Sequence, residues 1–173
     1  MTTELKDASE AKERLWKEIA KVRYGMLGLV GEKSGGHFQP MTAFCEPETG
    51  QIWFFTRTET DLARAARGPA DAMFVVQAKD QHFQACIGGR LEQQYDRARM
   101  DKYWNPIVAA WYPDGKDDPQ LTMLRLQAND AQVWLSETSP VRFFWEIAKA
   151  NVTHDEPNVG QSANVTLSDE RLA

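Results

Sequence analysis

The spacing of hydrophobic residues changes near the start of the chain, and this change separates a helix from a sheet. Between Thr3 and Arg23, apolar side chains recur every three or four residues with charged side chains between them, which predicts an amphipathic helix. From Tyr24 onward this period is lost, and short apolar runs alternate with turns rich in glycine, proline, asparagine and aspartate. The pattern therefore predicts an N-terminal helix followed by a sheet that extends to about Glu137.

The segments after this helix have the composition of β-strands. The longest has Gly88-Gly89 in its middle, which predicts a bulge or a sharp bend. Pro40 has no backbone N–H, so its strand must lie at an edge or contain a bulge. The predicted strands are Tyr24–Gly31, His37–Glu46, Ile52–Thr56, Asp71–Lys79, His82–Tyr95, Leu121–Gln127, Gln132–Glu137 and, in the C-terminal tail, Asn164–Leu167.

Turns and helices connect these strands. Residues 31–36 (GEKSGG) are interpreted as a hairpin turn, because Glu32 stands where a phosphate loop would need the glycine before its lysine. Asn129-Asp130 is predicted to be a turn between the two strands on either side of it. Thr60 is suited to be the N-cap of a short helix. The helices predicted after the first are 60–67, 96–112 with a break at Asn105-Pro106, and 140–151, where Pro140 fits the first turn.

Six or seven strands, joined mostly by short turns, predict a mainly β (α+β) fold, an antiparallel barrel with flanking helices. No internal repeat or linker divides the chain, so we expect one domain over residues 1–173. Its parts are the N-terminal helix at 3–23, the barrel at about 24–137, and a C-terminal helix and tail at 140–173. At 173 residues the chain can bury a core without disulfides.

Composition and charge narrow the classes of partner. A net charge of −5 argues against nucleic acid, whose phosphates are bound by clustered Lys and Arg. No apolar run approaches the ~20 residues needed to cross a bilayer, and the N-terminus lacks the apolar region of a signal peptide. We therefore expect a cytoplasmic protein without a membrane segment.

Cysteines and histidines give no sign of a metal or redox centre. Cys45 and Cys86 lie in separate strand-like segments without a CxxC pair, and they are interpreted as small buried hydrophobic residues. A disulfide or a redox pair is the alternative. The three histidines, His37, His82 and His154, lack the spacing of metal ligands, so no metal is expected.

The segment Trp104–Pro119 (WNPIVAAWYPDGKDDP) places two tryptophans and a tyrosine in a short apolar run before a polar loop. Large, flat side chains of this kind usually belong to a core, an interface or a stacking surface. Composition alone does not distinguish among the three. Trp111 and Tyr112 could therefore pack inside the subunit or cover a ligand held by a partner. Trp53, Phe54 and Phe55 alternate along a strand and must face opposite sides of the sheet.

Three segments resemble the FMN-binding split barrels related to pyridoxamine 5′-phosphate oxidase, and specifically their general stress protein 26-like branch. They are QPMT at Gln39–Thr42, IWFFT at Ile52–Thr56, and Trp104–Pro119 followed by LTMLRL at Leu121–Leu126. The third is the most specific, because its length, its aromatic residues and its GKDDP loop all coincide with that branch. The resemblance covers about residues 10–137 and implies a homodimeric split barrel with an FMN in each of two grooves between the subunits.

The resemblance also implies which residues would bind the cofactor. The isoalloxazine ring would lie along one strand, at Gln39, Pro40, Met41 and Thr42. The ribityl chain would lie over the next strand, at Phe54, Phe55 and Thr56. The phosphate would meet the start of a helix at Thr60, Asp61 and Leu62, where free backbone N–H groups favour an anion. Trp111 and Tyr112 would cover the flavin of the partner subunit.

The chain departs from the family pattern at several basic positions. The family usually has arginine where this chain has Gln39, and the oxidases have Ser-Arg-Lys where it has Thr60-Asp61-Leu62. Each lost charge-assisted hydrogen bond costs roughly 1.5–3 kcal/mol, so these changes would weaken phosphate binding. Arg57, Arg64 and Lys33 are the basic residues that could replace the missing ones.

The catalytic residues are not assigned, because no paired carboxylates, Ser/His/Asp set or activated cysteine can be assembled. This absence fits a flavoprotein, in which the cofactor carries the redox chemistry. The resemblance implies an oxidoreductase in which a reduced nicotinamide or a small organic molecule meets the flavin ring. Two alternatives stay open: a non-catalytic flavin-binding or stress-response protein, and a split barrel that binds another ligand such as a deazaflavin or haem.

Overall fold

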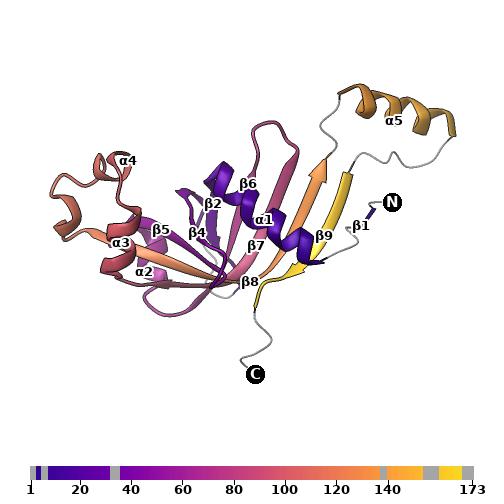
Figure 1. Ribbon diagram of the computed structural model, residues 1–173. Helices are drawn as coiled ribbons and strands as arrows, with labels where there is room; N and C mark the ends of the chain where they lie inside the picture. The colour runs from indigo at the N-terminus through magenta and orange to yellow at the C-terminus, as the bar shows by residue number, and fades with distance from the viewer. Residues whose placement is uncertain (1–2, 5–7, 32–35, 137–139, 154–159, 169–173) are drawn as a thin grey trace.

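The computed structural model describes residues 3–4, 8–31, 36–136, 140–153 and 160–168. Their main element is a mostly antiparallel sheet that curls into half a barrel, with a few helices around it (Figure 1). This architecture confirms the mainly β fold predicted from the sequence.

The strands are β1 (Thr3–Glu4), β2 (Tyr24–Leu29), β3 (Gln39–Thr42), β4 (Phe44–Glu46), β5 (Gln51–Arg57), β6 (Ala70–Gln77), β7 (Phe83–Gln93), β8 (Leu121–Ser136) and β9 (Gly160–Thr166). The helices are α1 (Ala8–Val22), α2 (Asp61–Ala65), α3 (Arg97–Tyr103), α4 (Pro106–Ala109), α5 (Pro140–Thr153) and the short 3-10 helix η2 (Gly115–Asp117).

Strand β8 joins the two parts of the sheet. On one side it pairs with β7, from Leu124 opposite Gln93 to Leu135 opposite Phe83. On the other side it pairs first with β5 and then with β9. The order β1-β9-β8-β7-β6-β2-β3 runs across the sheet, and β4 joins it through β5. This branch places β5 near α2 and α3, at one end of the molecule (Figure 1).

The predicted turn at Asn129-Asp130 is wrong, because β8 continues through it as one strand. The pairs with β7 run from Gly89 opposite Ala128 to Gly88 opposite Asp130, so Asn129 is the extra residue of a β-bulge. The bulge predicted at Gly88-Gly89 is therefore confirmed. The Asn129 carbonyl accepts hydrogen bonds from the backbone N–H groups of Leu167 (2.8 Å) and Ser168 (3.0 Å). Asn and Asp are typical turn residues, which is why the sequence predicted a turn here.

Two other predicted boundaries also shift. The first residues of the predicted N-terminal helix are instead β1, which pairs in parallel with β9 through Thr3 opposite Gln161. The predicted strand His37–Glu46 is divided into β3 and β4 at Ala43, whose backbone N–H donates to the Arg23 carbonyl at 2.7 Å. Strand β3 is the last strand on its side of the sheet, which confirms the edge position predicted for Pro40. Residues 32–35 of the predicted hairpin turn lie outside the described residues.

The short helices begin where capping residues predict. Thr60 is the N-cap of α2, because its Oγ1 accepts a hydrogen bond from the Ala63 backbone N–H at 3.1 Å. The helical stretch after Asp96 is broken before Pro106, as predicted, which separates α3 from α4. None of the helices in the described part of the chain has the length and apolar character to cross a bilayer.

Two groups of buried side chains hold the molecule together. The larger one lies between α1 and the sheet, where Leu15 and Ile19 of the helix are fully buried with Leu27 and Phe74 of the strands. Each such side chain contributes roughly 1.5–3 kcal/mol when buried. The smaller group attaches α3 and α4 to β5 and β8. Its buried members are Phe44, Trp53, Met100, Val108, Tyr112, Leu121 and Met123.

Candidate functional site

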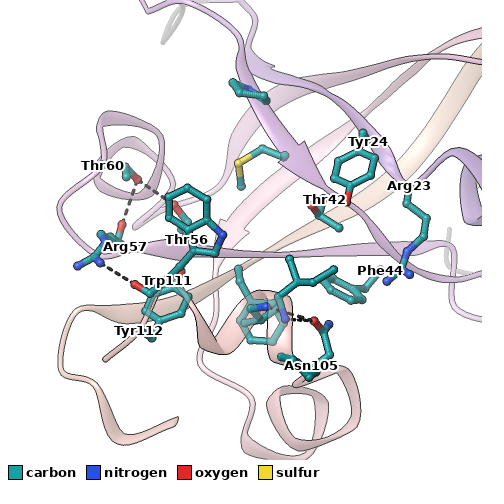
Figure 2. Close-up of a pocket in the computed structure, with 16 residues that line it drawn as sticks. Arg23, Tyr24, Thr42, Phe44, Thr56, Arg57, Thr60, Asn105, Trp111 and Tyr112 are labelled. Atoms are coloured by element: carbon teal, nitrogen blue, oxygen red, sulfur yellow. Dashed lines mark hydrogen bonds between the residues drawn. The ribbon is translucent and has the colours of Figure 1, made fainter. Parts of the chain in front are cut away.

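A groove of about 750 Å³ lies between the sheet and the segment that carries α3 and α4. Strands β3 and β5 contribute to one wall, and α4 contributes to another (Figure 2). Its volume is within the roughly 300–1,000 Å³ that is usual for small-molecule and cofactor sites. The lining residues are Arg23, Tyr24, Pro40, Met41, Thr42, Phe44, Phe55, Thr56, Arg57, Thr60, Asn105, Pro106, Ile107, Val108, Trp111 and Tyr112.

Eight of the twelve residues that the sequence predicts for a cofactor site line this groove. They are Pro40, Met41, Thr42, Phe55, Thr56, Thr60, Trp111 and Tyr112. The structure thus brings together residues that are up to 72 positions apart in the sequence, from Pro40 to Tyr112.

The other four predicted residues lie elsewhere. Phe54 is fully buried in the core, where its ring centroid is 5.2 Å from that of Phe74. Gln39, Asp61 and Leu62 line a separate cavity of about 280 Å³. The departures from the family pattern at these three positions therefore do not change the lining of the large groove.

The charged residues of the groove are positive. Among its described lining residues, Arg23 and Arg57 carry charge, and none is Asp, Glu or His. The chain as a whole has a net charge of −5, so the groove has the opposite sign to the protein average. Figure 2 shows Arg57 and Thr60 at one end of the groove, and Arg23, Tyr24 and Phe44 at the other. The groove is therefore suited to an anionic ligand.

Arg57 is held in place at its end of the groove. Its guanidinium donates to the Trp111 carbonyl at 2.7 Å and to the side chain of Gln120, and it lies 5.6 Å from the centre of the Tyr112 ring. The Thr60 hydroxyl donates to the Arg57 backbone carbonyl at 3.0 Å, and its Oγ1 lies 3.3 Å from that of Thr56. A guanidinium has five N–H donors, so these contacts leave others for an anion.

Comparison with known proteins identifies the family. The family model described as pyridoxamine 5′-phosphate oxidase like matches residues 10–158. The chain belongs to this family. No curated protein matches the sequence. The match includes every residue that lines the groove.

Solved structures of general stress proteins are similar to this member of the family. A candidate general stress protein 26 from Jannaschia sp. CCS1 is 34% identical over 91% of this chain and 99% of its own, with a TM-score of 0.76. A candidate general stress family protein from Xanthomonas campestris pv. campestris is 40% identical over 78% and 93%, with a TM-score of 0.70. The general stress FMN/FAD binding protein from Xanthomonas citri is 42% identical over 76% and 92%, with a TM-score of 0.69.

Trp111 and Tyr112 occupy different environments in this member of the family. Tyr112 is 6% exposed and packs inside the subunit, with its ring centre 6.2 Å from that of Trp104. Burial raises the pKa of its hydroxyl to about 12, so the hydroxyl stays protonated at neutral pH. Trp111 is 69% exposed and is free to cover a bound molecule. Tyr112 therefore follows the first of the two predicted alternatives, and the covering role of Trp111 stays a prediction.

The segment α3–α4 is fixed to the sheet by the carboxylate of Glu46. This buried side chain accepts hydrogen bonds from Arg99 (3.0 and 3.1 Å), Lys102 (3.2 Å) and the Tyr103 hydroxyl (2.9 Å). Burial alone would raise the pKa of Glu46, but the hydrogen bonds from Arg99, Tyr103 and Lys102 outweigh it and lower the pKa. The network fixes α3 and, through it, the position of α4 beside the groove.

Sequence reasoning did not assign eight of the lining residues to the site. They are Arg23, Tyr24, Phe44, Arg57, Asn105, Pro106, Ile107 and Val108. Arg57 was named only as one of three possible replacements for the missing basic residues. Of the others, Arg64 pairs with Asp61 at 2.7 Å on the surface, and Lys33 lies outside the described residues. The position of Arg57 directly after the IWFFT strand is the signal that could have distinguished it from the other two.

Proposed function

We propose that this protein binds FMN in the large groove and acts as a flavin-dependent oxidoreductase on a small molecule. Membership of the pyridoxamine 5′-phosphate oxidase-like family supports flavin binding, as does the likeness to the FMN/FAD binding protein from Xanthomonas citri. The observation that carries the proposal is the groove itself. It combines aromatic and apolar walls with two arginines and no acidic lining residue in the described chain, which fits a flat aromatic ligand with an anionic group.

The phosphate of FMN would bind at the end that holds Arg57, Thr56 and Thr60. Charge-assisted hydrogen bonds from a guanidinium are stronger than those between neutral groups, and hydroxyls can supply further donors. The negative charge of Asp61 is offset by its ion pair with Arg64, and Asp61 lines another cavity. Arg57 would therefore replace the basic residues that other members carry later in the sequence.

The isoalloxazine ring would lie toward the other end, along Met41 and Thr42. A bound flavin supplies hydride or electron transfer, and the chain's own residues bind it, orient it and exclude water from it. The groove offers no carboxylate or imidazole among its described residues, so we assign no side chain as a general acid or base. A reduced nicotinamide or a small organic molecule would be the reaction partner.

We also propose that the active form is a homodimer with the flavin between the subunits. Large apolar side chains are exposed around the groove: Tyr24, Met26, Ile107 and Trp111. Exposed apolar residues that gather in one region mark an interaction surface. A second copy of the chain would cover them and close the groove. A cytoplasmic location remains a prediction of the sequence.

Substitution of Arg57 tests the placement of FMN. We expect Arg57→Gln to weaken FMN binding about 10- to 100-fold, since a charge-assisted hydrogen bond contributes roughly 1.5–3 kcal/mol. Arg57→Lys should retain part of the affinity, because it keeps the charge. The dissociation constant is measured from quenching of FMN fluorescence, after thermal unfolding has confirmed that each variant is folded.

Arg67→Gln is the matched control, because Arg67 is exposed and does not line the groove. It should leave FMN affinity unchanged. A purified protein that takes up no added FMN would refute the proposed cofactor. Equal affinities of wild type and Arg57→Gln would refute the proposed site of the phosphate.

A second experiment separates an oxidoreductase from a protein that only stores or carries flavin. The flavin absorbance of the loaded protein is followed under anaerobic conditions while NADH or NADPH is added. An oxidoreductase that uses these donors should lose the absorbance and regain it when an acceptor is supplied. Unchanged absorbance with both donors would favour the alternative of a flavin-binding stress protein.

A further inference from the structure

Arg23 occupies a backbone position where glycine is usually favoured. It follows α1 directly and has a φ of 65°, in the left-handed region. Its N–H donates to the Ile19 carbonyl at 2.8 Å, and its own carbonyl accepts from Ala43 at 2.7 Å. This is the helix C-cap geometry in which glycine is common, and an L-residue there costs roughly 1–2 kcal/mol. The backbone therefore gives no reason for an arginine, and the reason must lie in its side chain.

Arg23 lines two cavities. Its guanidinium lies 5.5 Å from the centre of the Phe44 ring and lines the large groove at the end away from Arg57 (Figure 2). It also lines a second cavity of about 350 Å³. Within the described part of the chain, the Arg23 guanidinium has no ion pair, whereas the nearby Lys102 is held by Glu46. Arg23 thus presents an unpaired positive charge to both cavities.

The second cavity has the character of a site for a small aromatic anion. It shares Arg23, Phe44 and Asn105 with the groove. Its remaining walls include Tyr103 and Trp104, and its described lining contains no Asp or Glu. The Cys45 thiol in its wall is neutral, because burial raises its pKa to about 12. An arginine with aromatic walls is the combination that recognises a planar carboxylate attached to a ring.

We propose that this second cavity binds a small aromatic carboxylate, with the carboxylate on Arg23 and the ring among Phe44, Tyr103 and Trp104. The cavity shares Arg23, Phe44 and Asn105 with the groove, and Arg23 and Phe44 lie at the end where the flavin ring would lie. The bound molecule is therefore the reaction partner of the flavin, a role that rests on the proposed function. Binding of the carboxylate itself does not depend on the flavin.

Benzoate is the probe, and benzamide is its neutral counterpart of the same shape. Titration calorimetry measures both, with and without added FMN. We expect saturable binding of benzoate by the wild type and a loss of about 10-fold or more in Arg23→Gln, because the guanidinium provides a charge-assisted bond. Benzamide should bind both proteins equally and more weakly than benzoate. Arg14→Gln, which removes an exposed arginine from α1, should not change benzoate affinity.

Arg23→Gly provides the second variant. It should lose benzoate affinity like Arg23→Gln, yet unfold at a temperature equal to or above that of Arg23→Gln, because glycine suits the left-handed backbone. A gain in stability with a loss of binding would show that the arginine is retained for a ligand. FMN affinity should fall less in both variants than in Arg57→Gln, since the phosphate would bind at Arg57 and Arg23 lines the opposite end of the groove.

These measurements separate failure of the inference from failure of the proposed function. Benzoate that does not saturate, that binds Arg23→Gln as tightly as wild type, or that binds no better than benzamide overturns the inference, whatever FMN does. Binding of benzoate that depends on Arg23, in a protein that takes up no FMN, supports the carboxylate site and refutes the flavin function.

Discussion

His82 lies between two carboxylates that belong to different elements. Its Nε2 is 3.1 Å from Glu18 Oε2 of α1, and its Nδ1 contacts the Asp80 carboxylate in the turn before β7. The hydrogen bond with Asp80 raises the pKa of His82 most, burial opposes this, and Glu18 raises it further. The side chains of His82 and Glu18 are 10% and 12% exposed, so their contact is shielded from water, whereas the Asp80 side chain is 66% exposed. A charged His82 therefore connects α1 to the β6–β7 hairpin.

This arrangement predicts how stability depends on pH. Because the folded pKa of His82 lies above the unfolded value of about 6.5, its stabilisation is fully present below that pH and is lost as pH rises through the folded value. We expect His82→Gln to lower the free energy of unfolding by roughly 1–3 kcal/mol at about pH 6, and by less at about pH 9. Urea unfolding at both pH values measures the difference.

His37→Gln is the control for this experiment, since His37 is exposed. It should change stability little at either pH. Equal losses for His82→Gln at about pH 6 and about pH 9 would show that the charge of His82 plays no part in holding α1.

The alternating direction of side chains along a strand explains why the sequence predicted only part of the site. Phe54 and Phe55 were assigned to the site together by their place in the IWFFT motif. Neighbours on a strand face opposite sides, and only Phe55 lines the groove. Arg23 could not have been found in this way. Its contact with Phe44 depends on the hydrogen bond between Arg23 and Ala43, which joins parts of the chain that no local pattern relates.

At the level of elements, the sequence predicted strands well and their ends less well. The pattern of β-forming residues located β5 and β7. It misjudged the middle of β8, where Asn129-Asp130 has the composition of a turn but is held in the sheet by β7 and β9. It also missed β1, since a strand of two residues is defined by its partner β9 and not by its own composition.

The bulge at Gly88-Gly89 gives a prediction at this scale. A Cβ on Gly89 would lie 2.1 Å from the Gln127 backbone carbonyl oxygen, so alanine there must displace β8. A Cβ on Gly88 would lie 3.1 Å from the end of the Asp130 side chain, which can move. We expect Gly89→Ala to lower the free energy of unfolding by about 1–3 kcal/mol. Gly88→Ala should stay within roughly 1 kcal/mol of wild type.

Urea unfolding of the two alanine variants measures this contrast. Since both substitutions reduce the flexibility of the unfolded chain alike, their difference reports the native contact with β8. A loss in Gly88→Ala as large as that in Gly89→Ala would mean that the bulge has a different register from the one described.

The large exposed apolar side chains of the described residues are distributed unevenly over the surface of the molecule. Tyr24 and Met26 of β2 and Ile107 of α4 are exposed in the part of the molecule that contains the groove, and α5 lies at the far end (Figure 1). The Glu46 network fixes α3 beside this surface, so the surface is formed before any partner arrives. The proposed dimer would therefore need little rearrangement of the backbone.

Met26→Lys tests whether this surface joins two copies. Met26 is 41% exposed in the isolated subunit, and a lysine that becomes buried without a partner costs roughly 3–5 kcal/mol. We expect the dimer to dissociate about 100-fold more readily, which light scattering after size-exclusion chromatography detects as a fall in mass. FMN affinity should fall as well, because the second subunit closes the groove.

Val152→Lys is the matched control, since Val152 is an exposed apolar residue of α5. It should leave both the mass and the FMN affinity unchanged. A wild type that is monomeric at all concentrations would exclude the shared site. A Met26→Lys monomer that binds FMN as tightly as the wild-type dimer would mean that one subunit holds the flavin unaided. The exposed Trp111 would then cover the ring of its own chain, and the apolar surface on β2 would serve assembly alone.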